Sequence, residues 1–394
     1  MTRTVICGGA RTPIGKLSGA LSPLSATELG GRAIAAALAR GGIAAGAVER
    51  IVMGQVLQAG AGQNPARQAA AAGGVSADVP ALTLNKVCLS GLQAIHLADL
   101  LVRAGEAQVV VAGGMESMSR APHLLAGARA GLRMGSAELA DAMLVDGLTC
   151  AFEGRAMGEA TEDYAARAGI ARARQDELAV SSHERAAKAA AAGVLAEETV
   201  AIPVPQRRGG PVLVEADEGI AAGTTLDTLA RLRPAFAPAG AITAGNASQL
   251  SDGAAAVVVC SLETARALGA EPLAEILSYG EVAGPDPSLL TQPSRAIRAA
   301  CARAGVKIAA LDLLEINEAF AAVLAASLDD LGVADDRCNI NGGAIALGHP
   351  IGMSGARLAL SLALALRRRG GGIGAAGLCG GGGQGDAIVL RTID

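Results

Sequence analysis

The 394-residue chain has no tryptophan, three phenylalanines and two tyrosines, so aromatic side chains cannot fill its core. Because 51% of the residues are nonetheless apolar, we expect a large core of aliphatic side chains and alanine, in a chain long enough for two or three domains. No run of 18 apolar residues is free of both charge and glycine, which argues against a membrane-spanning helix. We therefore expect no membrane partner.

The seven cysteines form no Cys-x-x-Cys pair, so the sequence indicates neither a zinc site nor a disulfide framework, and we expect no metal. The net charge is −4, and no basic patch indicates nucleic-acid binding. The amino-terminal residues lack the pattern of a secretory signal. These features together predict a cytoplasmic protein.

The chain contains an internal duplication. Residues 32–43 match residues 295–306 at a shift of 263, and residues 90–113 match residues 354–377 at a shift of 264. Single matches of alanine and glycine are expected by chance in this composition, but a nearly constant shift across separated blocks is not. The period is far longer than that of a solenoid repeat, so each copy should be a whole α/β unit.

Within each copy, alanine-rich, helix-like stretches lead into short runs of β-branched residues. Residues 32–40 precede residues 50–54, and residues 91–103 precede residues 108–114. Continuous apolar runs of this length are typical of buried strands in a mostly parallel sheet. Runs of the same type at 257–259 and 388–390 are further expected strands.

The two copies differ by a large insertion in the first. In the second copy, residues 375–377 pass through a glycine-rich loop directly into residues 385–390, whereas a long charged segment separates the matching parts of the first copy. We assign residues 1–118 with 249–270 to an N-terminal half, residues 119–248 to an inserted loop domain, and residues 271–394 to a C-terminal half. The alternative is that the inserted segment forms a third, independent domain.

Cys88 is a candidate nucleophile. It directly precedes an apolar, helix-like stretch that begins near Ser90, and the free N–H groups at a helix N-terminus stabilise a thiolate. The alternative is an ordinary buried cysteine. That alternative suits the cysteines that lie in no such context: Cys7, Cys150, Cys260, Cys301 and Cys338.

His349 is a candidate base for that nucleophile. It lies in a segment, residues 341–352, in which glycines and a proline impose an irregular backbone. A histidine held in such a loop can take the proton from a thiol. His96 and His183 lie on expected helices and His123 follows a proline, so we expect these three to be structural or solvated.

Two further positions complete the candidate site. Cys379 precedes the glycines 380–383, whose small size lets a ligand approach backbone N–H groups that can form an oxyanion hole. A phosphate cradle is the competing interpretation, but no Gly-Lys-Ser or Gly-Lys-Thr accompanies the loop. Asn317 follows the apolar run 314–316, where it can either cap the next helix or hold a catalytic water.

These stretches, taken in this order, resemble the thiolase family. The resemblance extends from Arg11-Thr12-Pro13-Ile14-Gly15 through the segments around Cys88, Asn317 and His349 to the glycine loop after Cys379. It implies a duplicated five-layered α/β/α/β/α fold with a loop domain inserted in the first half. It also implies a homo-oligomer, either a dimer or a tetramer, and a role in lipid metabolism.

The implied activity is an acyl transfer: the reversible Claisen condensation of two acetyl-CoA to acetoacetyl-CoA. Cys88 would carry the acyl group after His349 accepts its proton, and Cys379 would remove the α-proton of the second acetyl-CoA. The N–H groups of Cys88 and Gly380 would form one oxyanion hole, and His349 with a water held by Asn317 the other. Coenzyme A would be a substrate, with no tightly bound cofactor.

The resemblance also implies a binding region for the acyl-CoA. Ser248 and Ala247 match the segment that contacts the pantetheine part, while Met157 and Phe320 match residues of the acyl pocket. Two positions depart from the pattern of many bacterial members.

The departures are Ala156, where those members have histidine, and Ala221, where a basic residue suited to the CoA phosphate is common. The first bears on acyl-chain length and the second on CoA affinity, so a broad-range 3-oxoacyl-CoA thiolase remains the nearest alternative.

Other enzyme classes are further alternatives. A ketoacyl synthase normally pairs its cysteine with two histidines, whereas the last catalytic position here is Cys379. A cysteine hydrolase acting on thioesters would not need Cys379, and a non-catalytic scaffold would have an unreactive Cys88.

Overall fold

The computed structural model describes residues 2–393, in which ten strands form one long mixed sheet with two parts and six short strands form three two-stranded sheets. The strand order is β14-β15-β16-β13-β1-β12-β5-β3-β4. The two parts meet where β1 and β13 share a short antiparallel pairing at Val5 and Ile6. The strands are β1 (Thr4–Arg11), β2 (Gly15–Lys16), which pairs with β12, β3 (Arg50–Gly54), β4 (Ala81–Leu84), β5 (Val109–Ser117), β12 (Ser251–Ser261), β13 (Ala274–Ala283), β14 (Leu313–Ile316), β15 (Ile373–Gly380) and β16 (Gln384–Arg391).

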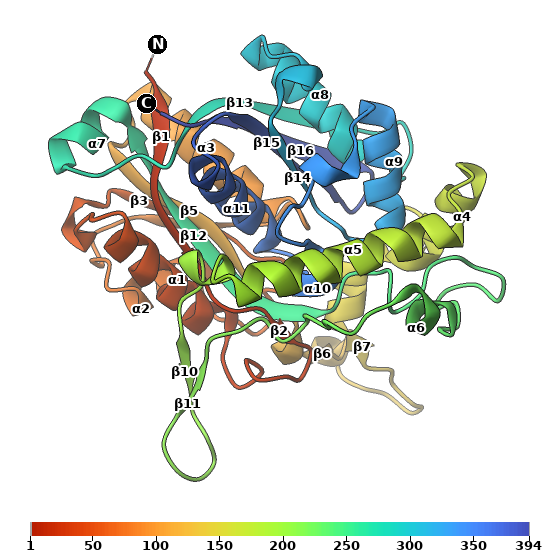
Figure 1. Ribbon diagram of the computed structural model, residues 1–394. Helices are drawn as coiled ribbons and strands as arrows, with labels where there is room; N and C mark the ends of the chain where they lie inside the picture. The colour runs from red at the N-terminus through yellow and green to blue at the C-terminus, as the bar shows by residue number, and fades with distance from the viewer. Residues whose placement is uncertain (1, 394) are drawn as a thin grey trace.

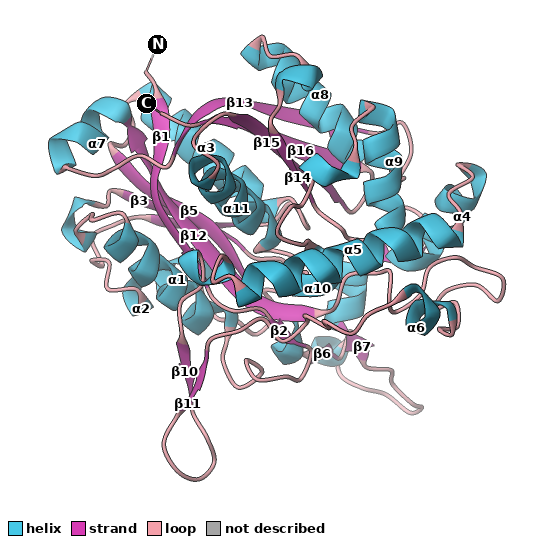
Figure 2. Ribbon diagram, in the orientation of Figure 1, coloured by secondary structure: helices cyan, strands magenta, loops and turns pink. Residues whose placement is uncertain are grey.

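Helices complete five layers, which Figures 1 and 2 show. Helices α1 and α2 cover the outer face of the first part of the sheet, and α8 and α9 cover that of the second. Helices α3 and α11 contact each other between the two parts. The helices are α1 (Ala26–Arg40), α2 (Pro65–Ala72), α3 (Ser90–Ala104), α7 (Leu262–Leu268), α8 (Gln292–Ala304), α9 (Ala321–Leu331), α10 (Ala344–Leu347) and α11 (Ser354–Arg368). The five-layered fold is confirmed.

The duplication is confirmed by the matching course of the two halves. Strands β3 and β5 pair in parallel, as do β14 and β15, and each pair continues into an antiparallel neighbour, β12 or β16. Helices α3 and α11 begin at Ser90 and Ser354, the two positions that the sequence match aligns. The expected strands at 50–54, 108–114, 257–259 and 388–390 fall within β3, β5, β12 and β16.

The central helix α3 lies in an apolar stretch of the sequence that resembles a membrane-spanning segment. Within the described residues, Val87–Ala104 has the length and hydropathy of a membrane-spanning helix, with a mean hydropathy of 1.3 over 18 residues. Half of this window is buried inside the protein, because α3 packs on the first part of the sheet and on α11. A Cβ at Gly91 would lie 2.8 Å from the backbone nitrogen of Ala356, so glycine permits this close crossing.

A long segment between β5 and β12 carries most of the smaller elements. It contains β6 (His123–Leu124), β7 (Ala140–Asp141), β8 (Thr149–Cys150), β9 (Arg155–Ala156), α4 (Met157–Arg167), α5 (Arg172–Ala191), β10 (Ile202–Val204), β11 (Val212–Val214) and α6 (Leu226–Ala230). Helix α5 packs on α9 and α10, and the β10–β11 hairpin projects from the body in Figure 1. The region that the sequence assigns to an insertion thus lies beside the second half.

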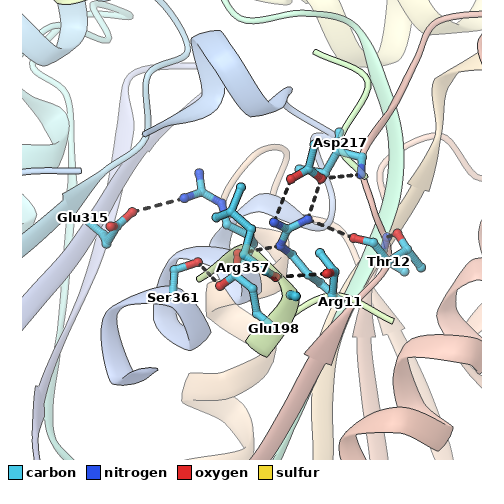
Figure 3. Close-up of polar contacts among 12 residues, drawn as sticks. Arg11, Thr12, Glu198, Asp217, Glu315, Arg357 and Ser361 are labelled. Atoms are coloured by element: carbon cyan, nitrogen blue, oxygen red, sulfur yellow. Dashed lines mark hydrogen bonds and ion pairs between the residues drawn. The ribbon is translucent and has the colours of Figure 1, made fainter. Parts of the chain in front are cut away.

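Buried charges tie this segment to the core (Figure 3). Arg11 of β1 is fully buried and donates to Glu198 at 2.7 Å and to Asp217 at 2.6 and 2.9 Å. Ser361 of α11 donates to the other oxygen of Glu198 at 2.7 Å. Because a buried charge that loses its partner is costly, these contacts fix the inserted segment against β1 and α11.

Candidate active site

A cavity of about 420 Å³ gathers nearly all of the candidate site residues. This size is typical of pockets for small molecules and cofactors. The inserted segment and both halves contribute side chains to its wall. The lining residues that the sequence singles out are Cys88, Ala156, Met157, Ala247, Ser248, Phe320, His349 and Cys379.

Cys88 lies in a tight turn between β4 and α3, two residues before the first residue of the helix. Burial raises the pKa of its thiol to about 11, although the backbone N–H groups of Cys88 and Gly381 bond to the sulfur and oppose this change. The backbone N–H of Cys88, at the start of the helix, lowers this pKa as expected from the sequence, but burial has the larger effect. Desolvation by the surrounding segments outweighs the helix, so the thiol needs a base.

The backbone N–H that faces the Cys88 sulfur belongs to Gly381, whereas the sequence assigned this position to Gly380. Gly380 is the last residue of β15 and packs so closely on Leu89 that a Cβ there would lie 2.6 Å from Leu89 Cγ. Gly381 begins the turn that leads to β16, and it lines the cavity. This correction depends on the hairpin geometry, which a run of four glycines does not reveal.

His349 is buried and held in one orientation. Its Nδ1 lies 2.6 Å from the hydroxyl oxygen of Ser354, and that hydroxyl donates to the carbonyl oxygen of Pro350 at 2.9 Å. In this arrangement Nδ1 carries the proton and Nε2 is left as an acceptor. Burial, with a contribution from the charge of Arg357, lowers the pKa of His349 to about 3. The imidazole is therefore neutral at physiological pH and can accept a proton.

Asn317 lies beside His349 and does not cap a helix. Its Nδ2 is 3.4 Å from His349 Nε2, while Phe320 occupies the N-cap position of α9. The N-cap alternative is therefore wrong. Asn317 Oδ1 is buried without a hydrogen-bond partner among the described residues, which leaves an acceptor for a ligand or water at the edge of the site.

Cys379 is the second thiol of the cavity. It lies near the end of β15 opposite Gly385 and is 1% exposed. Burial raises the pKa of Cys379 well above its ordinary value, and the neighbouring Cys88 raises it further. A thiol of this kind is seldom ionised, but its thiolate is a strong base.

The expected acyl-CoA contacts line the same cavity. The backbone N–H and the hydroxyl of Ser248 both donate to the carbonyl oxygen of Ala319, at 3.1 and 3.0 Å, and Ala247 bridges to Phe320. Phe236 is a lining residue that the sequence did not single out. Its ring meets that of Phe320 edge to face at 6.3 Å, so two of the three phenylalanines in the chain lie here.

Of the other histidines, His123 is exposed, whereas His183 and His96 have structural surroundings. His183 of α5 is buried and accepts a hydrogen bond from the Ala221 N–H at 3.2 Å. His96 of α3 stacks on Tyr279, with ring centroids 3.9 Å apart. Among residues 2–393, no group of histidine, cysteine, aspartate or glutamate side chains could hold a metal ion.

The fold and the cavity define the class of this protein: a two-part α/β enzyme whose substrate cavity holds two thiols and a neutral imidazole. The model of the thiolase N-terminal domain matches residues 4–263, and that of the thiolase C-terminal domain matches residues 270–392. The chain belongs to the thiolase family and is an acyltransferase.

Named relatives cover the whole chain. A probable acetyl-CoA acetyltransferase of Mycolicibacterium smegmatis is 56% identical over 387 residues, which are 98% of this chain and 100% of that protein. A protein of the same name from Mycobacterium tuberculosis is 55% identical over 392 residues, covering 100% of both chains. The acetyl-CoA acetyltransferase of Cupriavidus necator is 50% identical over 392 residues, covering 99% of this chain and 100% of that protein.

Proposed function

We propose that this protein is an acetyl-CoA C-acetyltransferase, which condenses two acetyl-CoA to acetoacetyl-CoA and CoA and catalyses the reverse cleavage. The observation that carries the proposal is the single cavity in which Cys88, Cys379 and a neutral His349 meet. The printed names of full-length relatives support the acetyl substrate. Coenzyme A enters and leaves as part of the substrates, and the scheme needs no resident cofactor.

In the first half-reaction Cys88 attacks the thioester carbon of acetyl-CoA while Nε2 of His349 takes the thiol proton. The CoA thiolate leaves with that proton, and the acetyl group stays on the Cys88 sulfur. The N–H groups of Gly381 and Cys88, which bond to the Cys88 sulfur, would donate to the oxyanion that forms on this carbonyl.

In the second half-reaction the thiolate of Cys379 takes a proton from the methyl group of a second acetyl-CoA. The raised pKa of this thiol makes its thiolate the stronger base that carbon acids require. The resulting carbanion forms a carbon–carbon bond with the acetyl carbonyl, and the bond to the Cys88 sulfur breaks. The proton that Cys379 took from the methyl group passes to the departing Cys88 thiolate, so both sulfurs return to their starting states. A water bonded to the free Oδ1 of Asn317, together with His349, would stabilise the enolate oxygen.

The test is CoA-dependent cleavage of acetoacetyl-CoA beside a long-chain 3-oxoacyl-CoA, with kcat/KM measured for each. A strong preference for acetoacetyl-CoA supports the proposal, and comparable values indicate a broad-range thiolase instead. Cleavage of neither substrate would overturn the assigned function. A Cys379→Ala variant with full turnover of thioesters would indicate a hydrolase.

We also propose that the protein acts in the cytoplasm, in lipid metabolism, as a homo-oligomer. Support for the oligomer comes from exposed apolar side chains in the first part of the inserted segment, among them Leu132, Met134, Leu139 and Phe152. Light scattering after size exclusion tests this proposal. A monomer at micromolar concentration would contradict it.

A further inference from the structure

The residue before Cys88 has a strained backbone. Val87 has φ of 52°, in the left-handed region that β-branched residues rarely adopt. Its side chain faces the glycine turn after β15, because a Cβ at Gly381 would lie 3.3 Å from a methyl group of Val87. Strain of this kind persists only where surrounding contacts hold the backbone in place.

Lys86 supplies those contacts from the other neighbour of the strained residue. Its ammonium group donates to Gln93 Oε1 at 2.9 Å, to Asp386 Oδ1 at 2.9 Å and to the carboxylate of Glu281. All three ammonium hydrogens are therefore used, and the side chain is only 15% exposed. Because its ammonium group bonds to protein groups rather than to solvent, Lys86 holds the turn that carries Cys88 in place.

Asp386 is itself fixed in the second half of the chain. It is fully buried in β16, and its second oxygen accepts a hydrogen bond from the hydroxyl of Tyr279. Along the β15–β16 pairing Asp386 lies opposite Leu378, and the next residue of β15 is Cys379. The strand pair that carries one thiol of the site thus also holds the turn that carries the other.

We propose that Lys86 is a positioning residue whose ion pair with Asp386 fixes the Val87–Cys88 turn against the β15–β16 strand pair and so sets the distance between the Cys88 and Cys379 sulfurs. This inference rests on the proposed function, because only the carbon–carbon bond step needs both sulfurs. Transfer of acetyl between CoA and Cys88 does not use the Cys379 thiol.

The two steps give separate measurements. Exchange of labelled CoA into acetyl-CoA reports the transfer to Cys88, and cleavage of acetoacetyl-CoA reports the step that also needs Cys379. For Lys86→Met we expect the kcat of cleavage to fall about 100-fold, the loss typical of a 1 Å misplacement, with KM nearly unchanged. The exchange rate should fall much less than the cleavage rate.

Companion variants separate positioning from folding. Lys86→Met leaves Asp386 without its cation, so the Tm of this variant should fall. The double variant with Asp386→Asn has no such unpaired charge, so it should recover Tm without recovering cleavage. Lys86→Arg, which keeps a cation, should recover much of the activity. Lys307→Met is the matched control, because the side chain of this exposed lysine makes no hydrogen bond or ion pair among the described residues, and its only bond there is through the backbone.

The inference is overturned if cleavage and exchange fall in the same proportion, or if the double variant regains both Tm and cleavage. It is also overturned if Lys86→Met keeps full activity. Failure of the proposed function has a different signature, since the wild-type protein would then catalyse neither exchange nor cleavage.

Discussion

The two halves begin their central helices in the same way and yet contribute different chemistry. In each half a serine at the start of the helix donates its hydroxyl to a carbonyl of the preceding turn: Ser90 to Val87 at 2.6 Å, and Ser354 to Pro350 at 2.9 Å. In the first half the turn carries a thiol, and in the second an imidazole that uses the serine as its partner. One duplicated scaffold thus places an acid and a base at neighbouring helix ends.

Each turn is also held by a carboxylate from the opposite half. Lys86 of the first half bonds to Asp386 of β16, whereas the loop after His349 is held by Glu116 at the end of β5. Glu116 is fully buried and accepts the N–H of Gly352 at 3.0 Å, with two further N–H bonds from residues 56 and 57. The two turns therefore carry different reactive groups, but each is anchored by the other half, so neither half can form the site alone.

The largest effect should come from removing the thiol in the turn before the central helix of the first half. Cys88→Ala should lower kcat for acetoacetyl-CoA cleavage by ~10⁴-fold or more, because no other nucleophile can carry the acetyl group. His349→Ala should cost less, about 10²–10⁴-fold, since water can replace part of its role as a base. Equal losses in the two variants would remove this distinction between the halves.

The contact by which Glu116 of the first half holds the loop after His349 can be tested by substitution. Glu116→Gln replaces a carboxylate that accepts three N–H bonds with an amide that has one oxygen, which should lower the free energy of unfolding by about 1.5–3 kcal/mol. Activity should fall as well, because the loop that carries His349 loses its anchor. Urea unfolding with kcat measurements checks both effects.

Glu263→Gln, an exposed substitution of the same type in α7, is the control for Glu116→Gln. If the two variants unfold at the same urea concentration, Glu116 does not hold the loop.

The buried imidazole should make stability depend on pH. The pKa of His349 is lowered in the folded protein to about 3, so below pH 6.5 the unfolded chain takes up a proton that the folded protein does not. Relative to His349→Asn, the wild type should lose up to about 1.4 kcal/mol of stability for each pH unit from 6.5 towards 4. Urea unfolding at pH 7, 6 and 5 measures the difference, with the exposed His123→Asn as control. Parallel pH profiles would argue against a neutral, buried His349.

The smallest effect should come from the paired serines. Ser354→Ala removes the hydroxyl beside His349 Nδ1 and should lower kcat about fivefold, the equivalent of one hydrogen bond of about 1 kcal/mol. Ser90→Ala removes the matching hydroxyl, on which no imidazole depends. The pH profile of kcat should therefore shift only in Ser354→Ala, and a shift in both variants would contradict the comparison.

Much of this architecture could be predicted from the sequence because the signals are local. The runs at 50–54 and 108–114 are short and rich in β-branched residues, which favours strands, and the alanine-rich stretches before them favour helices, so the repeat and the layers follow. Cys88 is marked in the sequence by the helix-like stretch that follows it, and His349 by the glycines and proline around it.

What could not be predicted depends on segments that are distant in the chain. The identity of the N–H donor, Gly381, is decided by where the β15–β16 hairpin turns. The raised pKa of Cys88 follows from burial by several segments, and the role of Asn317 follows from its place beside His349. Phe236 could have been found from the sequence, because phenylalanine is rare in this chain and a bulky ring among small residues is typical of a pocket wall.

The position of β12 has a consequence for how the protein is made. This strand lies between β1 and β5 but follows them in the chain after the long inserted segment, and Thr4 of β1 pairs with Ser261. On the ribosome β1 must wait for residues 251–261, which at roughly 5–20 residues per second takes about 12–50 s. Until then two bare strand edges are exposed, so the nascent chain depends on slow, long-range pairing and is open to aggregation or chaperone binding during that interval.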